Sequence, residues 1–180
     1  YLEIRVKCLF EEMGFHIREG RKGGNLEDYV IDASADFNTQ LPVALEIKSG
    51  KKPCLERGDL RQLDDWVFEL SGEDRIRRFR PTRGRNVVYI TAGLPVGPSS
   101  HPTPHKGVLV FNGPLGVKFH ERLAACVNEN DLEFVEKRYF CIIPFQTLIE
   151  MAQHIEEETL TRSDAWEMIH CCSGILQFPG

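Results

Sequence analysis

Two charged side chains stand in the middle of an otherwise apolar, strand-like run at residues 42–48. Because alternate side chains of a strand point to opposite faces, Leu45 and Ile47 are predicted to face a core. Glu46 and Lys48 then emerge together on the opposite face. A carboxylate and an ammonium in the middle of a strand cost stability unless they are paired or bind something. The pair therefore favours a sheet that carries a functional site on one face.

A second strand-like run, at 27–37, precedes the first and is acidic. Its aspartates Asp28, Asp32 and Asp36 share one strand parity, and a polar turn at 38–40 leads back into the apolar run, which predicts an antiparallel hairpin. Carboxylates from two adjacent strands with a lysine beside them are what a one-metal hydrolytic site requires. The carboxylates hold a divalent cation, and the lysine orients or deprotonates the attacking water.

The residues alone leave open which aspartate would join Glu46. Asp28 and Asp32 would lie about 13 Å apart along a strand that rises ~3.3 Å per residue, too far to ligate one ion together. A tight hairpin centred near residues 38–39 would set Asp32 opposite Glu46. A bulge or a longer turn would be needed to bring Asp28 level with it.

Length and composition indicate one globular domain over 1–180, with 42% hydrophobic and 27% charged residues. No apolar run approaches the roughly 18 residues that a membrane span needs, and no signal-peptide pattern opens the chain. The six cysteines lack CxxC spacing, so we interpret them as buried or incidental thiols in a reducing cytoplasm. Because Tyr1 stands inside a helix-like pattern, we expect a piece of a longer protein, with companion domains or a homodimer as candidate partners.

The net charge of −5 argues against a nucleic-acid partner, but the basic residues are unevenly distributed. One cluster, between 75 and 85, is arginine-rich, and a solvated surface explains it equally well. A second cluster begins at Lys48, where the chemistry would lie. Its members are candidate nucleic-acid contacts: Lys51, Lys52, Arg57 and Arg61.

Hydrophobic periodicity and turn residues predict an α/β chain. Helices are expected at 2–13 (ended by Gly14), 58–70, 118–137, 145–157 and 163–171, the last with Ser163 as its N-cap. Strands are expected at 15–18, 27–37, 42–48, 87–90, 107–111 and 139–143.

This order of helix, strand, hairpin with Asp and then Glu-x-Lys, and helix bearing Gln resembles the PD-(D/E)xK, or restriction-endonuclease-like, nuclease superfamily. Segments 60–67 and 106–112 make the chain similar, along nearly its whole length, to mostly uncharacterised bacterial domains of that superfamily. The resemblance implies a central mixed β-sheet flanked by helices, with a core order of α-β-β-β-α-β. One departure is the arginine- and proline-rich segment 73–105, which looks inserted.

The resemblance also implies a Mg²⁺- or Mn²⁺-dependent endonuclease that cuts nucleic acid, with DNA favoured over RNA as the expected substrate. In that family pattern Glu46 and an aspartate of the preceding strand bind the metal, with the carbonyl of Ile47 as a third ligand. The sequence of residues 26–31, which follows a Gly-rich loop, is closest to the family's Asp motif. It favours Asp28 as that aspartate. Hard divalent cations prefer such oxygen ligands.

Further residues take their roles from the same resemblance. Lys48 would act on the attacking water, and Gln62 matches a glutamine that several of these nucleases place on the next helix. Trp66, one turn later, we interpret as a core residue. Glu3 corresponds to an acid often found near the metal and equally fits an exposed helix surface.

Two functional hypotheses follow from these residues. The first is an active nuclease, in restriction, repair or phage defence by analogy. The second is a catalytically inactive nuclease-like module that binds or scaffolds inside a larger protein. Retention of both Glu46 and Lys48 disfavours the second, because an inactive site could replace them with apolar residues.

Overall fold

The computed structural model describes residues 2–19, 28–32, 43–49, 55–75, 106–112 and 127–178. Within them one six-stranded sheet runs in the order β1-β2-β3-β4-β5-β6. The strands are β1 (His16–Glu19), β2 (Asp28–Asp32), β3 (Val43–Ser49), β4 (Gly107–Asn112), β5 (Cys141–Pro144) and β6 (Gly174–Ile175). The first three strands pair antiparallel, and β3 to β6 pair parallel. The expected mixed sheet and its α-β-β-β-α-β core order are confirmed.

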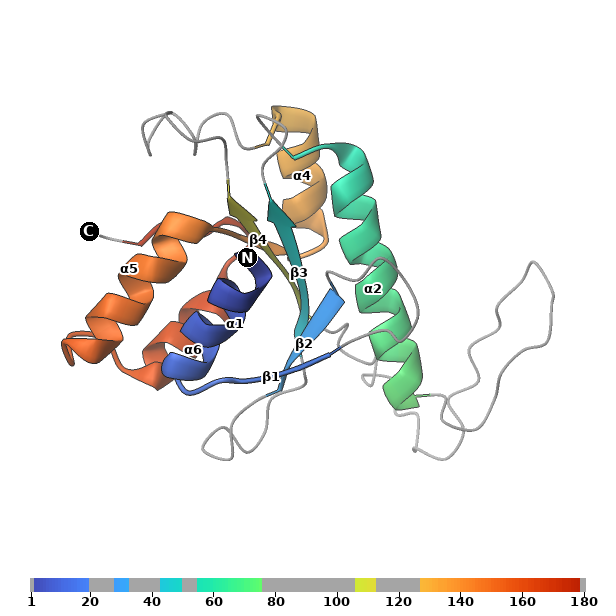
Figure 1. Ribbon diagram of the computed structural model, residues 1–180. Helices are drawn as coiled ribbons and strands as arrows, with labels where there is room; N and C mark the ends of the chain where they lie inside the picture. The colour runs from blue at the N-terminus through green and yellow to red at the C-terminus, as the bar shows by residue number, and fades with distance from the viewer. Residues whose placement is uncertain are drawn as a thin grey trace, which may run out of the picture.

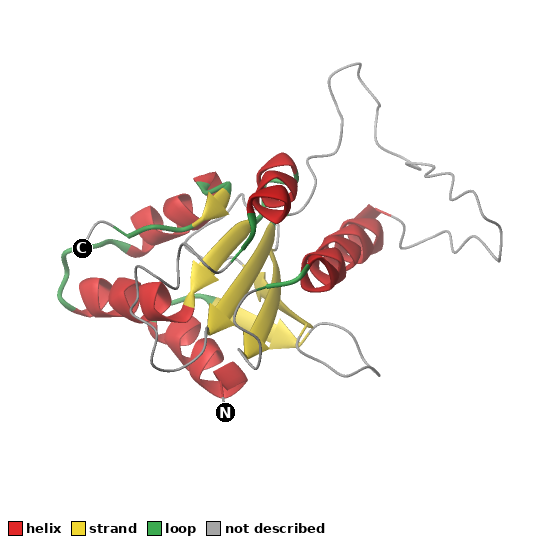
Figure 2. Ribbon diagram, turned by 90° about the horizontal axis from the view of Figure 1, so that it is seen from above, coloured by secondary structure: helices red, strands yellow, loops and turns green. Residues whose placement is uncertain are grey.

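Helices cover both faces of this sheet (Figures 1 and 2). They are α1 (Leu2–Glu12), α2 (Arg57–Arg75), α4 (Glu129–Lys137), α5 (Phe145–Glu156) and α6 (Arg162–Cys171). Helices α1, α5 and α6 share a core cluster with Leu45 and Ile47 of β3. Helices α2 and α4 share a second cluster, which includes Ala44 of the same strand. The alternation predicted for β3 is therefore confirmed, and its Ala44 face looks toward α2.

Gly14 ends α1 as the sequence predicts. Its φ of +87° lies in the left-handed region, where a residue without a Cβ is favoured. The backbone N–H of Gly14 donates to the Glu11 carbonyl at 2.9 Å, and that of Phe15 donates to the Phe10 carbonyl at 2.9 Å. This pair of bonds is the Schellman arrangement, and the Phe10 and Phe15 rings, 6.0 Å apart, supply the apolar contact that accompanies it.

We expect Gly14→Ala to lower the free energy of unfolding by about 1–2 kcal/mol, because an L residue is disfavoured at positive φ. A Cβ there would also lie 2.8 Å from Arg162 Nε, so that side chain would have to shift. Gly58→Ala is the matched control, since a Cβ at Gly58 meets nothing within 4 Å and the residue lies in α2. It should stabilise by up to about 1 kcal/mol. Urea denaturation of both variants measures this, and shifts of the same sign would contradict it.

Several element boundaries differ from the sequence predictions, among them the end of α2, which runs to Arg75, and three of the differences have a local physical cause. The helix expected at 118–137 begins at Glu129, because Asn128 is extended (φ −72°, ψ 161°) and its side chain accepts from the Asp131 N–H; residues 118–126 lie outside the described part. The strand expected from Tyr139 begins at Cys141, because residues 139 and 140 close the last turn of α4 through bonds to the carbonyls of residues 136 and 135.

The third difference is the N-cap of α6, which is Thr161 and not Ser163. Thr161 is extended (φ −82°, ψ 156°), and its hydroxyl accepts from the backbone N–H of Asp164 at 3.1 Å. The same hydroxyl donates to the Asp164 carboxylate at 2.7 Å. An acid three residues after the cap makes Thr161 the better-satisfied start, because its hydroxyl bonds both the backbone N–H and the carboxylate of Asp164.

Several predictions fall outside the described residues. They include the strand at 87–90, the outer part of the run at 27–37, and all but the first three residues of segment 73–105. No helix in the described ranges combines the length and the apolar character that a membrane span requires.

Candidate functional site

The register of β2 on β3 sets Asp28 directly opposite Glu46. Ile31 pairs with Val43, so residues 32–42 connect the two paired segments, and the tight hairpin that would bring Asp32 level with Glu46 does not form. Asp32 instead pairs with His16 of β1. Of the two aspartates that the sequence left open, the backbone therefore brings Asp28 to the level of Glu46.

Glu46 and Lys48 form an ion pair on the α2 face of β3. The Lys48 Nζ lies 2.7 Å from Glu46 Oε1. Glu46 is buried, with 1% of its surface exposed, while 19% of the Lys48 side chain remains exposed. The alternation of the strand places both on one face, two residues apart. A buried carboxylate is thus balanced by an ammonium that solvent can still reach.

Helix α2 adds Gln62 to this pair. The Lys48 Nζ donates to Gln62 Oε1 at 2.6 Å, across an interface between strand and helix. Gln62 lies on the exposed side of α2, whereas Leu63 beside it is fully buried. The structure therefore brings together three residues that the sequence singled out: Glu46, Lys48 and Gln62.

Asp59 is a fourth residue at this point, and the sequence analysis missed it. Its Oδ1 lies 4.0 Å from Lys48 Nζ, and its Oδ2 accepts from the backbone N–H of Glu56 at 2.9 Å. One carboxylate oxygen thus stabilises the start of α2 while the other faces the lysine. The signal was an acid in the first turn of the helix, three residues before Gln62 and so on the same surface.

Trp66 is a core residue, as the sequence indicated. It is 1% exposed and belongs to the cluster beneath α2. Its indole Nε1 donates to the backbone carbonyl of Tyr29 at 3.0 Å. Because Tyr29 follows Asp28 in β2, this bond ties the helix that carries Gln62 to the strand that carries Asp28.

Glu3 lies on the other side of the sheet. It accepts a hydrogen bond from the Tyr29 hydroxyl at 3.4 Å, and Tyr29 belongs to the core cluster of α1, α5 and α6. Glu46 lies on the opposite face of the sheet, which α2 covers. The hydrogen bond of Glu3 therefore lies on the face covered by α1, α5 and α6, and not on the face of Glu46.

Two arginines fasten α4 to α2. Arg57 Nε lies 2.7 Å from Asp131 Oδ1, and Arg138 Nη1 lies 3.3 Å from Asp64 Oδ1. Both guanidinium groups also face the ring of Phe134, at 4.7 and 5.5 Å from its centroid. The sequence suggested Arg57 as a nucleic-acid contact. The structure gives it a structural partner, since its charge is balanced by the buried Asp131.

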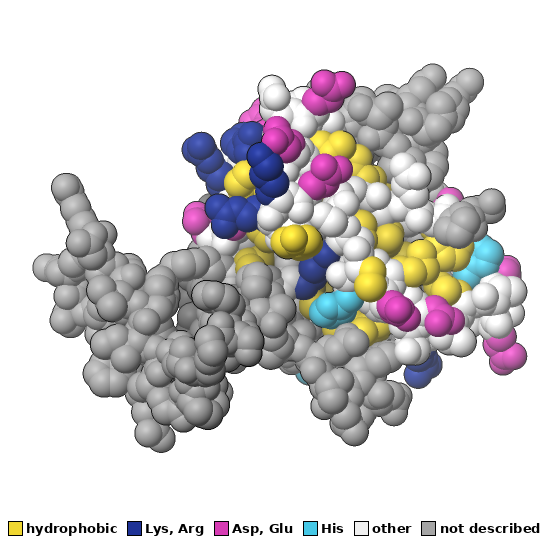
Figure 3. Space-filling view, turned by 180° about the vertical axis from the view of Figure 1, so that it is seen from behind, with side chains coloured by type: hydrophobic (Ala, Val, Ile, Leu, Met, Phe, Trp, Pro, Cys, Tyr) yellow, Lys and Arg dark blue, Asp and Glu magenta, His cyan; other side chains and the backbone are white. Residues whose placement is uncertain are grey.

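Of the other basic candidates, only Arg61 is described, and it is exposed on α2 beside Gln62. Lys51 and Lys52 lie outside the described residues. On the rear of the molecule, Lys and Arg side chains gather together with Asp and Glu side chains (Figure 3). The surface charge of that face is therefore mixed.

The predicted metal ligands are Glu46, Asp28 and the Ile47 carbonyl. Among the described residues, no three His, Cys, Asp or Glu side chains form a metal-binding group. The side chain of Asp28 lies outside the described part, so this absence does not bear on the predicted set. The donors are all oxygen, which fits Mg²⁺ or Mn²⁺ and not a soft metal. The metal site stays a prediction.

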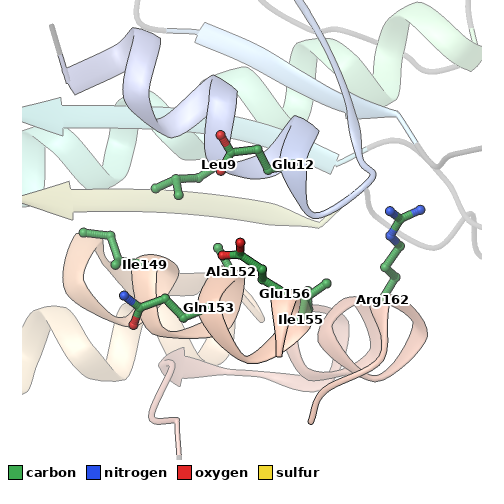
Figure 4. Close-up of a pocket in the computed structure, with 8 residues that line it drawn as sticks. All are labelled: Leu9, Glu12, Ile149, Ala152, Gln153, Ile155, Glu156 and Arg162. Atoms are coloured by element: carbon green, nitrogen blue, oxygen red, sulfur yellow. The ribbon is translucent and has the colours of Figure 1, made fainter. Parts of the chain in front are cut away.

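A pocket of about 590 Å³ lies elsewhere, between α1 and α5 (Figure 4). Leu9, Ile149 and Ala152 contribute apolar lining, and Glu12 and Arg162 contribute charge. These residues belong to helices on the face opposite α2, so the pocket is separate from the Glu46 ion pair.

The fold is restriction-endonuclease-like. It is similar to the solved structure of restriction endonuclease FokI, with a TM-score of 0.52 and 14% identity over 98% of this chain. A second structure, FokI bound to DNA, has a TM-score of 0.49 and the same identity and coverage. The chain spans 28% of the FokI chain in both cases. No protein-family model and no curated protein matches the sequence.

Proposed function

We propose that this chain is a metal-dependent nuclease of the PD-(D/E)xK kind, which hydrolyses phosphodiester bonds of nucleic acid. The observation that carries the proposal is the convergence of Glu46, Lys48 and Gln62, with Nζ–O distances of 2.7 and 2.6 Å. Asp28 stands opposite Glu46 in the register. Residues directly opposite in an antiparallel pair have Cβ atoms about 5 Å apart, close enough to share a ligand.

In this proposal Asp28, Glu46 and the Ile47 carbonyl would hold Mg²⁺ or Mn²⁺. When bound, such an ion offsets the charge that builds on the scissile phosphate and makes a water more acidic. Lys48 positions the attacking water through its ammonium hydrogens, and two acceptors fix the direction of that ammonium: Glu46 from the sheet and Gln62 from the helix. Asp59 supports the same lysine from the start of α2.

DNA is the substrate we propose, in preference to RNA, because the similar fold is that of a restriction endonuclease. Arg61, exposed beside Gln62, would contact backbone phosphates, and so would Lys51 and Lys52, which follow β3. Arg57 is omitted from this surface because it pairs with Asp131. Restriction, repair or phage defence would each suit such an activity by analogy of fold.

The experiment is a cleavage assay with supercoiled plasmid, linear duplex, single-stranded DNA and RNA, each with Mg²⁺, Mn²⁺ or EDTA. We expect DNA to be cut with either metal and to remain intact in EDTA, because the chemistry needs the ion to activate water. The proposal fails if the folded protein leaves every substrate intact with both ions.

The alternative is an inactive binding or scaffold module. Calorimetric titration with Mn²⁺ distinguishes it from an active nuclease. An active site binds the ion. Glu46→Gln should abolish that binding, because it removes one of the two carboxylate charges of the predicted site. A scaffold has no reason to keep a carboxylate metal site, so absence of Mn²⁺ binding in the unaltered chain would favour it. The negative net charge is the feature that speaks for this alternative.

A further inference from the structure

Two cysteines meet where the last helix and strand pack on β5, on the face of the sheet opposite α2. Cys141 opens β5 and is fully buried. Cys172 is the C-cap of α6 and is partly buried. Cys141 pairs in register with Gly174, two residues after Cys172, and Cys172 packs against the core cluster that contains Cys141. The Cys172 Sγ also lies 3.6 Å from the Gly174 carbonyl oxygen.

Lys106 lies next to Cys141 and Cys172. Lys106 immediately precedes β4 and is half-buried, and its Nζ donates to the backbone carbonyl of Cys172. Its backbone carbonyl in turn accepts from the N–H of Ala44 at 2.9 Å, which fixes it against β3. The ammonium is close enough to interact with the thiols of Cys141, Cys171 and Cys172. A cation in this position stabilises a neighbouring thiolate.

The two thiols differ in their environments. A hydrogen bond from Cys141, together with the Lys106 charge, lowers the pKa of Cys172 against the opposing effect of partial burial. Burial raises the pKa of Cys141 well above its ordinary value. His170 lies near Lys106, and burial and the Lys106 charge lower the pKa of His170, which favours its neutral form. Of the two thiols, Cys172 is therefore the one whose surroundings favour ionisation, while burial favours the protonated form of Cys141.

We propose that Cys172 and Cys141 are a peroxide-oxidisable dithiol pair, positioned by Lys106 and independent of the nuclease site. The Cys172 thiolate attacks one oxygen of hydrogen peroxide, the O–O bond breaks, and a sulfenic acid forms with release of hydroxide. The Cys141 sulfur then attacks the sulfenic sulfur, and its proton leaves with the hydroxyl group as water. Two thiols are oxidised by two electrons to one disulfide, and one peroxide is reduced.

The product would link β5 to the segment that joins α6 and β6. Such a cross-link restricts the unfolded chain, so the oxidised protein should unfold at a temperature higher by on the order of 10 °C. In a reducing compartment the bond would be transient and reversible by thiols. A small oxidant can reach the partly exposed Cys172, while the buried Cys141 is protected until that first step has occurred.

The test treats the full chain with stoichiometric hydrogen peroxide, alkylates the remaining thiols and maps the peptides by mass spectrometry. We expect a cross-linked peptide containing both Cys141 and Cys172, with a mass lower by two hydrogen atoms, that disappears with dithiothreitol. In Cys141→Ser, dimedone should instead trap a sulfenic acid on Cys172. Exposed Cys8 on α1 is the internal reference, and it should react several-fold more slowly than Cys172.

Two lysine variants test the role assigned to Lys106. Lys106→Met should slow oxidation of Cys172 several-fold without changing that of Cys8, while Lys106→Arg should keep most of the rate because it keeps the charge. A circular dichroism spectrum at each stage shows whether the chain stays folded. The proposal is overturned if the folded protein forms no Cys141–Cys172 cross-link, or if Cys172 reacts no faster than Cys8.

Discussion

Lys48→Met is expected to reduce DNA cleavage by about 10²–10⁴-fold, the contribution typical of a group that handles the proton of the nucleophile. Methionine keeps much of the length of the lysine stem and removes the ammonium that donates to Glu46 and Gln62. Binding of Mn²⁺ should persist in this variant, since the carboxylate of Glu46 is unchanged. Plasmid cleavage under single-turnover conditions and calorimetry measure the two properties separately.

The same change also affects stability. Glu46 is buried, and removing its ammonium leaves a buried carboxylate without that partner, which costs about 3–5 kcal/mol. The double variant Glu46→Gln with Lys48→Met should recover part of this loss, because no charge is then buried, and yet remain inactive. Lys137→Met makes the same replacement at an exposed lysine and should keep both activity and stability. Full cleavage by folded Lys48→Met would contradict the role given to Lys48.

The second large effect is expected from Trp66→Phe. The variant removes the bond from the indole to the Tyr29 carbonyl and leaves space in the cluster beneath α2. Together these losses should cost about 2–4 kcal/mol in the free energy of unfolding. Because the bond holds β2 against the helix bearing Gln62, we also expect cleavage to fall by about tenfold or more at temperatures where the variant is folded.

Trp166→Phe is the matched control. Trp166 is equally buried but lies on the opposite face, with its ring 5.1 Å from that of Phe15 and 4.6 Å from that of His170. It should lose a similar amount of stability and keep its cleavage rate. Urea denaturation and cleavage assays on both variants make the comparison. Equal losses of activity at equal folded fractions would mean that Trp66 stabilises the fold without positioning the site.

Local physics explains what could be predicted along β3 and at the end of α1. The alternation of Leu45 and Ile47 with Glu46 and Lys48 follows from the geometry of one strand, and the structure has the two apolar residues in one core cluster. Gly14 ends its helix because only a residue without a Cβ adopts positive φ at little cost. Such features depend on neighbours a few residues away, so the sequence carries them directly.

Pairings between distant segments were not predictable in the same way. The sequence suggested Arg57 as a nucleic-acid contact, but in the structure it forms an ion pair with Asp131 of α4, a helix far along the chain. Asp59 was not singled out from the sequence, because it reaches Lys48 only when α2 docks on β3. In α6 the sequence predicted Ser163 as the cap, whereas the bonds between Thr161 and Asp164 make Thr161 the cap in the structure.

By itself, the sequence determined which residue types lie on each face of β3, and so which charged groups were available for a site. Only the tertiary structure decided how they meet: Asp28 level with Glu46, and Gln62 within hydrogen-bond distance of Lys48. The reason is that side-chain alternation has a period of two residues and depends only on adjacent residues of the same strand. Register and helix docking depend instead on loop length and on packing summed over the whole core.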